Sequence, residues 1–214
     1  DPTKRYYYTL LFGDKYRVKI ATRNVNIPGI QNFRDLGGYP SYPGKKQMRW
    51  GMIYRSAEID SLEYCSRREL KNLGIKTLID LRTPSEIGRQ SPLQKGFNVV
   101  HIPLATGDME DILQGIREEK IKCDTVYRMV ERMNRTLIDK YTKEYRQIFD
   151  ILLDKTNYPV VIHCSSGKGR TGIVSALVLA ALGINEDIIM EDYRLSNDYF
   201  NIPRASKYAY RLLT

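Results

Sequence analysis

The sequence is poor in the residues on which disulfide scaffolds and metal sites depend. Its 214 residues include three cysteines and two histidines. The cysteines, at positions 65, 123 and 164, have neither the number of a disulfide framework nor the paired spacing of a zinc site. We therefore expect no disulfide scaffold, no bound metal and no other cofactor.

Long apolar runs and long basic runs are missing as well. The longest apolar run, Ile173–Leu182, is far shorter than the roughly 20 residues of a membrane-spanning helix, so no membrane span is expected. Lysine and arginine outnumber aspartate and glutamate by 34 to 25, but they are spread along the chain instead of forming a nucleic-acid-binding arm. The net charge of +9 favours an anionic phosphate ester or a phosphorylated protein over nucleic acid as the partner.

Internal repeats and low-complexity linkers are absent, so a single domain over residues 1–214 is expected. A hydrophobic content of 42% is sufficient for a substantial core. The sequence begins at Asp1 instead of methionine, which is compatible with a removed signal peptide and with an artificial boundary. Secreted, periplasmic and cytoplasmic locations therefore stay open, and so does the oligomeric state.

The chemistry is concentrated in a turn between a predicted strand and a predicted helix. The β-branched run Val160–His163 after Pro159 predicts a buried strand, and the apolar run Thr171–Leu182 before Gly183 predicts a buried helix. Such a turn aims consecutive backbone N–H groups and the positive end of a helix dipole at one point. The turn is therefore a candidate anion-binding site.

Cys164 opens this turn and Arg170 closes it. A cysteine attacks as the thiolate, which a helix N-terminus, Lys168 and Arg170 all favour. The guanidinium of Arg170 matches two oxygens of a tetrahedral phosphate, and Gly167 and Gly169 let the backbone approach an anion. The spacing excludes an ATP-binding loop, because a glycine follows Lys168 where that loop needs Ser or Thr. The predicted phosphate-binding residues are Ser165, Ser166, Gly167, Lys168, Gly169, Arg170 and Thr171.

His163, Cys164, Arg170 and Thr171 together resemble the signature of the cysteine-dependent protein-tyrosine phosphatase superfamily, which is His-Cys, five residues, Arg, then Ser or Thr. The resemblance implies a phosphate monoester hydrolase with a cysteinyl-phosphate intermediate, acting on phosphotyrosine or another phosphoprotein without a metal. The Gly-Lys-Gly-Arg interior resembles the loop of phosphoinositide phosphatases, so phosphoinositides and inositol polyphosphates are alternative substrates. A non-catalytic phosphate-binding module is the contrasting interpretation, and a rhodanese-like sulfurtransferase is disfavoured by Arg170.

The segments 32–39 and 50–56 resemble the opening of one bacterial branch of tyrosine and lipid phosphatases. Within them we expect Arg34 to pair with Asp35 and Arg55 to be a structural ion-pair partner, in preference to direct substrate contact. The segment Glu191–Tyr193 resembles a part of the family that follows the catalytic helix, and a packing role is expected for it.

Alternating strands and helices predict an α/β fold with a central, mostly parallel sheet flanked by helices. Ligands in such folds bind beyond the carboxyl ends of the strands. In this sequence the predicted strands end at Asp80, Pro103 and His163, so the segments after these residues are expected near the site. Residues 1–30 are expected to form an N-terminal hairpin that acts as an extra edge or a lid. Residues 108–140 are predicted to be a helical insertion, which resembles the lid of some bacterial members but is equally compatible with a solvated insertion.

A carboxyl group is needed to protonate the leaving oxygen. Asp108 is the first candidate, since it resembles in placement the acid of dual-specificity phosphatases, a few residues after an Ile-Pro strand. Asp80 is the second, in an Asp-Leu-Arg stretch similar to that of the bacterial branch; Glu110 and Asp111 are further carboxyls near Asp108. The bacterial branch usually carries an aspartate just before the arginine of the loop, and this sequence has Gly169 at that position. A role of that aspartate in the branch therefore cannot be assigned to this sequence. A helix cap or an ion pair is the alternative role for each candidate.

The segment Thr83-Pro84-Ser85-Glu86 has the spacing of a capping box, with Pro at the first helical position. The sequence therefore predicts a structural role for Glu86, as a helix cap.

Overall fold

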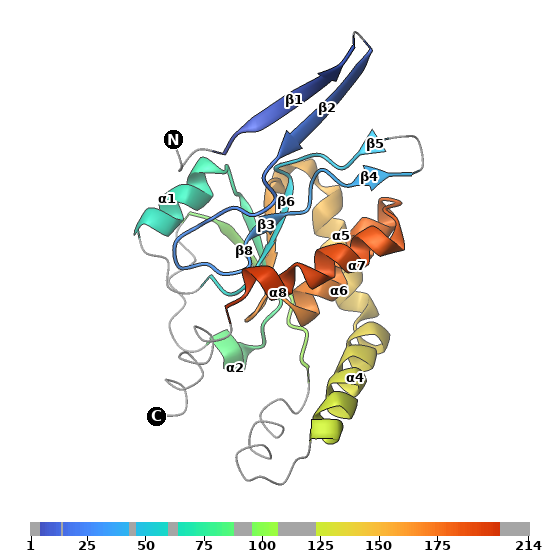
Figure 1. Ribbon diagram of the computed structural model, residues 1–214. Helices are drawn as coiled ribbons and strands as arrows, with labels where there is room; N and C mark the ends of the chain where they lie inside the picture. Colours follow the sequence, from blue (N-terminus) through green and yellow to red (C-terminus); the bar gives the residue numbers. More distant parts are fainter. Residues whose placement is uncertain are drawn as a thin grey trace.

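The computed structural model describes residues 5–13, 15–42, 46–59, 64–87, 96–106 and 123–201. Within these ranges the chain forms a central sheet with helices packed on it and a separate hairpin that projects from the body (Figure 1). The predicted α/β class is confirmed.

The described part of the central sheet has five strands in the order β3-β6-β9-β7-β8. β6, β9, β7 and β8 are parallel to their neighbours, and β3 pairs with β6 in the antiparallel sense. The strands are β3 (Arg34–Asp35), β6 (Ile53–Ser56), β7 (Thr77–Asp80), β8 (Asn98–His101) and β9 (Val160–His163). The register places Asp80 opposite His163, so the carboxyl ends of β7 and β9 lie side by side.

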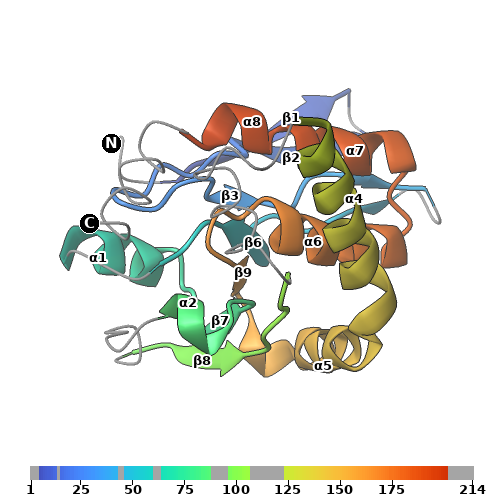
Figure 2. The same cartoon turned by 90° about the horizontal axis from the view of Figure 1, so that it is seen from below.

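The helices pack against this sheet from two sides. α6 contacts β9, α7 and α4 (Figure 2), while α1 lies against the other face. The helices are α1 (Tyr64–Asn72), α2 (Pro84–Ile87), α4 (Cys123–Lys140), α5 (Thr142–Leu153), α6 (Gly169–Ala181), α7 (Glu186–Arg194) and α8 (Ser196–Tyr199), with a 3-10 turn η2 (Lys155–Asn157). None of the helices within the described ranges is long and apolar enough to cross a membrane.

The strand before the predicted catalytic turn is buried on both faces. Val160 and Ile162 of β9 belong to one apolar cluster, together with Val174 of α6. Val161 points into a second cluster that includes Leu70 of α1. This two-sided burial explains why β9 is a continuous apolar run instead of an alternating one.

The N-terminal hairpin is present. Of the two roles expected for it, an extra edge of the core sheet is wrong, and a lid over the core stays a prediction. β1 (Tyr7–Phe12) pairs antiparallel with β2 (Tyr16–Ala21) in a sheet of its own, and a second small ribbon joins β4 (Pro40–Ser41) to β5 (Lys46–Gln47). The hairpin is attached to the body by Trp50, whose Nε1 donates to the Lys19 carbonyl at 2.9 Å. Residues 107–122, which include much of the predicted helical insertion 108–140, lie outside the described residues. A lid role for this insertion therefore stays a prediction.

Candidate active site

The segments after three parallel strands meet at one arginine. Arg170 lies in the first turn of α6, and its Nη1 is 3.3 Å from the carbonyl of Leu81 and 3.4 Å from that of Leu104. Leu81 follows β7, and Leu104 follows β8 by three residues. The convergence expected from the carboxyl-end rule is therefore observed, with Cys164 directly after β9.

Cys164 is buried, with 1% of its surface exposed. The backbone N–H of Gly167 donates to its Sγ at 3.3 Å, as expected for a loop that stabilises a thiolate. Gly167 has a φ of +68°, and a Cβ there would lie 2.4 Å from the carbonyl oxygen of Ser56. This position therefore requires glycine. A Cβ on Gly169 would meet no described atom within 4 Å, so the protein itself does not demand glycine there.

Glu86 forms a bidentate ion pair with Arg170 through both of its carboxylate oxygens. Oε1 and Oε2 each accept a hydrogen bond of 2.6 Å, from Nη2 and Nη1 of the guanidinium, and Oε1 also accepts one of 2.7 Å from Ser165. Burial by itself disfavours the charged forms, but these contacts outweigh it. They lower the pKa of Glu86 to about 2, and together with the Cys164 sulfur they raise the pKa of Arg170.

The sequence assigned Glu86 only a cap, and that cap is confirmed, since the N–H of Thr83 donates to Oε2 at 2.9 Å. The second role of Glu86, its ion pair with Arg170, depends on β7 and β9 being neighbours in the sheet. The spacing of the capping box does not reveal that neighbourhood. Among the described residues, no hydrogen-bond partner engages Nε of Arg170, whose Nη1–Nη2 edge is held by Glu86. A phosphate can therefore approach the guanidinium from its Nε side.

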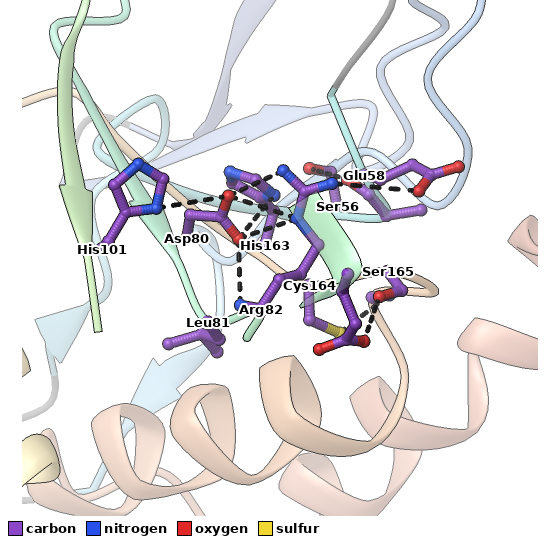
Figure 3. A network of polar contacts seen from close by, with 12 residues as sticks. Ser56, Glu58, Asp80, Leu81, Arg82, His101, His163, Cys164 and Ser165 are labelled. Atoms are coloured by element: carbon purple, nitrogen blue, oxygen red, sulfur yellow. Dashed lines mark hydrogen bonds and ion pairs between the residues drawn. The ribbon is translucent and has the colours of Figure 1, made fainter. Parts of the chain in front are cut away.

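Asp80 is fully buried and engaged by Arg82. The guanidinium donates to Oδ1 at 2.9 Å and to Oδ2 at 2.7 Å, and the backbone N–H of Arg82 donates to Oδ1. Burial alone would raise the pKa of Asp80, but the Arg82 contacts and nearby His163 leave it lowered. Figure 3 shows its carboxylate directed toward Arg82, His163 and His101, with Cys164 and Ser165 apart from that group.

The expected Arg34–Asp35 pair is wrong. Adjacent strand residues point to opposite faces, and the two side chains find different partners. Asp35 pairs with Arg5 at 2.6 Å, while Arg34 pairs with Asp192 at 3.4 Å. Arg55 pairs with the same aspartate at 2.7 Å, so its expected structural role is confirmed. Asp192, for which packing was expected, is the buried anion between two arginines, although no sequence pattern in α7 indicates this.

The remaining loop residues differ in exposure. Lys168 lies at the rim, where its Nζ donates to Asn197 at 3.3 Å and stands 5.6 Å from the ring centroid of Phe200. The Thr171 hydroxyl is buried without a hydrogen-bond partner among the described residues.

The acid candidates Asp108, Glu110 and Asp111 fall outside the described residues. The described part of the chain contains no group of three or more His, Cys, Asp or Glu side chains that could hold a metal.

A model of the tyrosine phosphatase family matches residues 25–211. The triple specificity protein phosphatase PtpB of Mycobacterium tuberculosis is 29% identical over 199 residues, covering 80% of this chain and 68% of that protein. A tyrosine-protein phosphatase of Nostoc commune is 28% identical over 152 residues, covering 68% of this chain and 48% of that protein. The inositol diphosphatase DSP4 of Arabidopsis thaliana is 39% identical over only 49 residues, which are 23% of this chain and 25% of that protein.

Proposed function

Because the chain belongs to the tyrosine phosphatase family, we propose that it hydrolyses phosphate monoesters through a cysteinyl-phosphate intermediate, with phosphotyrosine or another phosphoprotein as substrate. The observation that carries the proposal is one short loop in which a backbone N–H faces the Cys164 sulfur and Arg170 offers the Nε side of its guanidinium. Sulfur nucleophile, amides and cation are the parts that phosphoryl transfer requires.

In the first step the Cys164 thiolate attacks phosphorus opposite the ester oxygen. An S–P bond forms while the P–O bond breaks, and the electron pair leaves with the oxygen, which takes a proton from a carboxylic acid. Arg170 and the loop N–H groups hold the equatorial oxygens as charge spreads over them. Glu86 keeps the guanidinium in place from its opposite edge.

In the second step water attacks the phosphocysteine. The same carboxyl group, now ionised, removes a proton from the water, and the sulfur departs as thiolate with the electron pair of the S–P bond. The buried hydroxyl of Thr171 is proposed to donate to the departing sulfur once it rotates toward it. The products are inorganic phosphate and the free enzyme.

Asp108 is the proposed acid. The support is its place a few residues after Ile102-Pro103 and the unsuitability of its competitor, because Asp80 is ionised and held by Arg82. A group with a lowered pKa and two engaged oxygens is a weak proton donor at neutral pH. Asp108→Asn is expected to lower kcat on an alkyl phosphate by about a hundredfold, while an activated aryl phosphate suffers less. Full activity of Asp108→Asn on the alkyl phosphate would exclude the assignment.

A phosphoinositide or inositol polyphosphate is the second candidate substrate class. It is favoured by the positive charge that Lys168 adds to the loop for a multiply phosphorylated ligand, and by the short similarity to a plant inositol diphosphatase. A panel that compares a phosphotyrosine peptide, a phosphoserine peptide, a phosphoinositide and an inositol polyphosphate by kcat/KM separates the classes. A preference of more than about tenfold for either inositol compound would favour this candidate over the phosphoprotein.

The reaction itself is tested by acid quench with a radiolabelled phosphotyrosine peptide. We expect label on Cys164 in the wild type, and a loss of turnover of at least about 10,000-fold in Cys164→Ser. Cys65→Ser is the matched control, since Cys65 lies on α1 away from the loop, and it should retain both signals. Phosphate binding without turnover in the wild-type protein would instead identify a binding module.

A further inference from the structure

The loop that holds Cys164 has carbonyl groups as well as N–H groups, and the carbonyls of Ser166 and Gly167 accept hydrogen bonds from buried side chains. The carbonyl of Gly167 accepts hydrogen bonds of 3.0 Å from Nδ2 of Asn32 and 2.8 Å from Nη2 of Arg55. Nδ2 of Asn32 also lies 3.2 Å from the carbonyl oxygen of Ser166. One asparagine, 134 residues away in sequence from Ser166, thus engages two successive carbonyls of the loop.

The Ser166 carbonyl and the Gly167 N–H belong to a single planar peptide group, so they point in opposite directions. The donor on one side of this group is Asn32, and the acceptor on the other side is Sγ of Cys164, 3.3 Å from the Gly167 nitrogen. A hydrogen bond to the carbonyl polarises the N–H and strengthens its bond to the sulfur. Asn32 therefore acts on the nucleophile through one peptide group.

The orientation of the Asn32 amide is determined by its other partner. Oδ1 accepts a hydrogen bond from Nη1 of Arg34, and a guanidinium has donors only. Nδ2 must consequently face the loop carbonyls. The backbone supports the same placement: Asn32 has a φ of +55°, its N–H donates to the Tyr199 carbonyl at 3.0 Å, and the residue is 2% exposed. Asparagine is among the few residues that tolerate this left-handed conformation.

Behind Asn32, two buried arginines share one aspartate. Arg34 and Arg55 both pair with Asp192, and Ser196 accepts from both guanidinium groups. Burial and the neighbouring Arg55 lower the pKa of Arg34 to about 10, which still leaves it charged at neutral pH. Two cations against one anion leave a surplus of one positive charge in this described cluster. This charge lies behind the loop, where it favours the thiolate and a bound phosphate.

We propose that Asn32 is a positioning residue for the phosphatase reaction: it holds the 166–167 peptide so that its N–H points at Cys164, and Arg34 with Asp192 holds Asn32. The proposal rests on the function proposed above, but it predicts a property of the sulfur that is measurable without turnover.

Asn32→Gly and Asn32→Asp test this inference. Glycine keeps the left-handed backbone and removes the amide, while aspartate keeps the size and the Arg34 contact and replaces the donor by an acceptor. The Asp variant also gains an ion pair with Arg34. It therefore provides a second test of the inference if the Gly variant does not fold. The matched control is Asn157→Ala, which removes an asparagine Nδ2 that donates to a backbone carbonyl, that of Ile151 at 2.9 Å, far from the loop.

The readout is alkylation of Cys164 by iodoacetamide, followed at that residue by mass spectrometry. At mildly acidic pH, where the thiolate fraction limits the rate, both Asn32 variants should react about tenfold more slowly than wild type. At alkaline pH the rates should converge. Arg170, which interacts electrostatically with Cys164, and Glu86, which binds Arg170, are unchanged in the variants. The more distant charged and titratable groups around the loop, Lys168, Asp80 and His163, are unchanged as well.

In parallel, kcat/KM on para-nitrophenyl phosphate should fall about tenfold in both Asn32 variants and remain at the wild-type value in Asn157→Ala. Alkylation rates within about twofold of wild type at both pH values, in folded variants, would overturn the proposal. A wild-type protein without turnover would refute the proposed function instead, and the alkylation comparison would still decide the role of Asn32.

Discussion

The inner and the outer side of the loop from Cys164 to Arg170 are held by different kinds of contact. On the inner side, Asn32 and Arg55 donate to loop carbonyls and are sealed from solvent, with exposures of 2% and 0%. On the outer side, Arg170 is held by Glu86, whose side chain is 32% exposed. A buried ion network is costly to break, whereas a partly exposed pair is weakened by water and salt. We therefore expect the inner side to maintain the shape of the loop and the outer side to adjust the position of Arg170, the proposed phosphate-binding group.

The largest effect is expected on the inner side. Asp192→Asn leaves Arg34 and Arg55 buried without their anion, so the free energy of unfolding should fall by about 3 kcal/mol. Urea titration measures this change. Asp139→Asn, on the exposed face of α4, is the control and should change the stability by less than about 0.5 kcal/mol. If both variants were equally stable, the inner network would have no structural role.

A second comparison concerns the two glycines of the loop. Gly167→Ala places a Cβ against the Ser56 backbone at a positive φ, and the unfolding free energy should fall by about 2 kcal/mol together with most of the activity. Gly169→Ala meets no described atom and lies at the start of α6, so stability should stay within about 0.5 kcal/mol of wild type. Thermal unfolding and para-nitrophenyl phosphate hydrolysis are the measurements. Equal losses in both variants would contradict the assigned steric role of Gly167.

On the outer side, Glu86→Gln removes the charge that holds Arg170 but keeps the shape of the side chain. We expect kcat/KM to drop about tenfold while stability changes by no more than about 1 kcal/mol. Glu131→Gln is matched to it, because Glu131 pairs with an exposed arginine, Arg135, at 2.8 Å on α4. It should leave kcat/KM unchanged. A variant Glu86→Gln that lost several kcal/mol of stability but kept its kcat/KM would reverse the distinction between the two sides.

The smallest effect is a pH dependence of the outer pair. The pKa of Glu86 is lowered from 4.5 to about 2 in the folded protein. A lowered pKa means that the unfolded state binds more protons, so the contribution of Glu86 is complete above pH 4.5 and is lost as the pH falls toward 2. The difference in unfolding free energy between wild type and Glu86→Gln should therefore shrink over this interval. A difference that stayed constant down to pH 2 would show that the carboxylate makes no such contribution.

Much of the fold and the secondary structure that frames the candidate site could be predicted from local patterns. The buried strand before Cys164, the helix after it and the cap at Thr83 depend on neighbouring residues, and each is observed. The family was also predictable, because the spacing of Cys164 and Arg170 is a property of the sequence. The partners of Arg34 and Glu86 were not, since Asp192 and Arg170 reach them from distant segments.

The sequence by itself determined the candidate nucleophile Cys164, the candidate phosphate-binding residue Arg170 and the two elements that bracket them, because a strand, a tight turn and a helix are specified by residues close in the chain. Only the tertiary structure decided what supports that loop. Asn32 and Arg55 on its inner side and Glu86 on its outer side are 135, 112 and 84 residues from their partners. Contacts of that kind exist only after the parallel strands have brought their carboxyl ends together, and a local pattern carries no record of them.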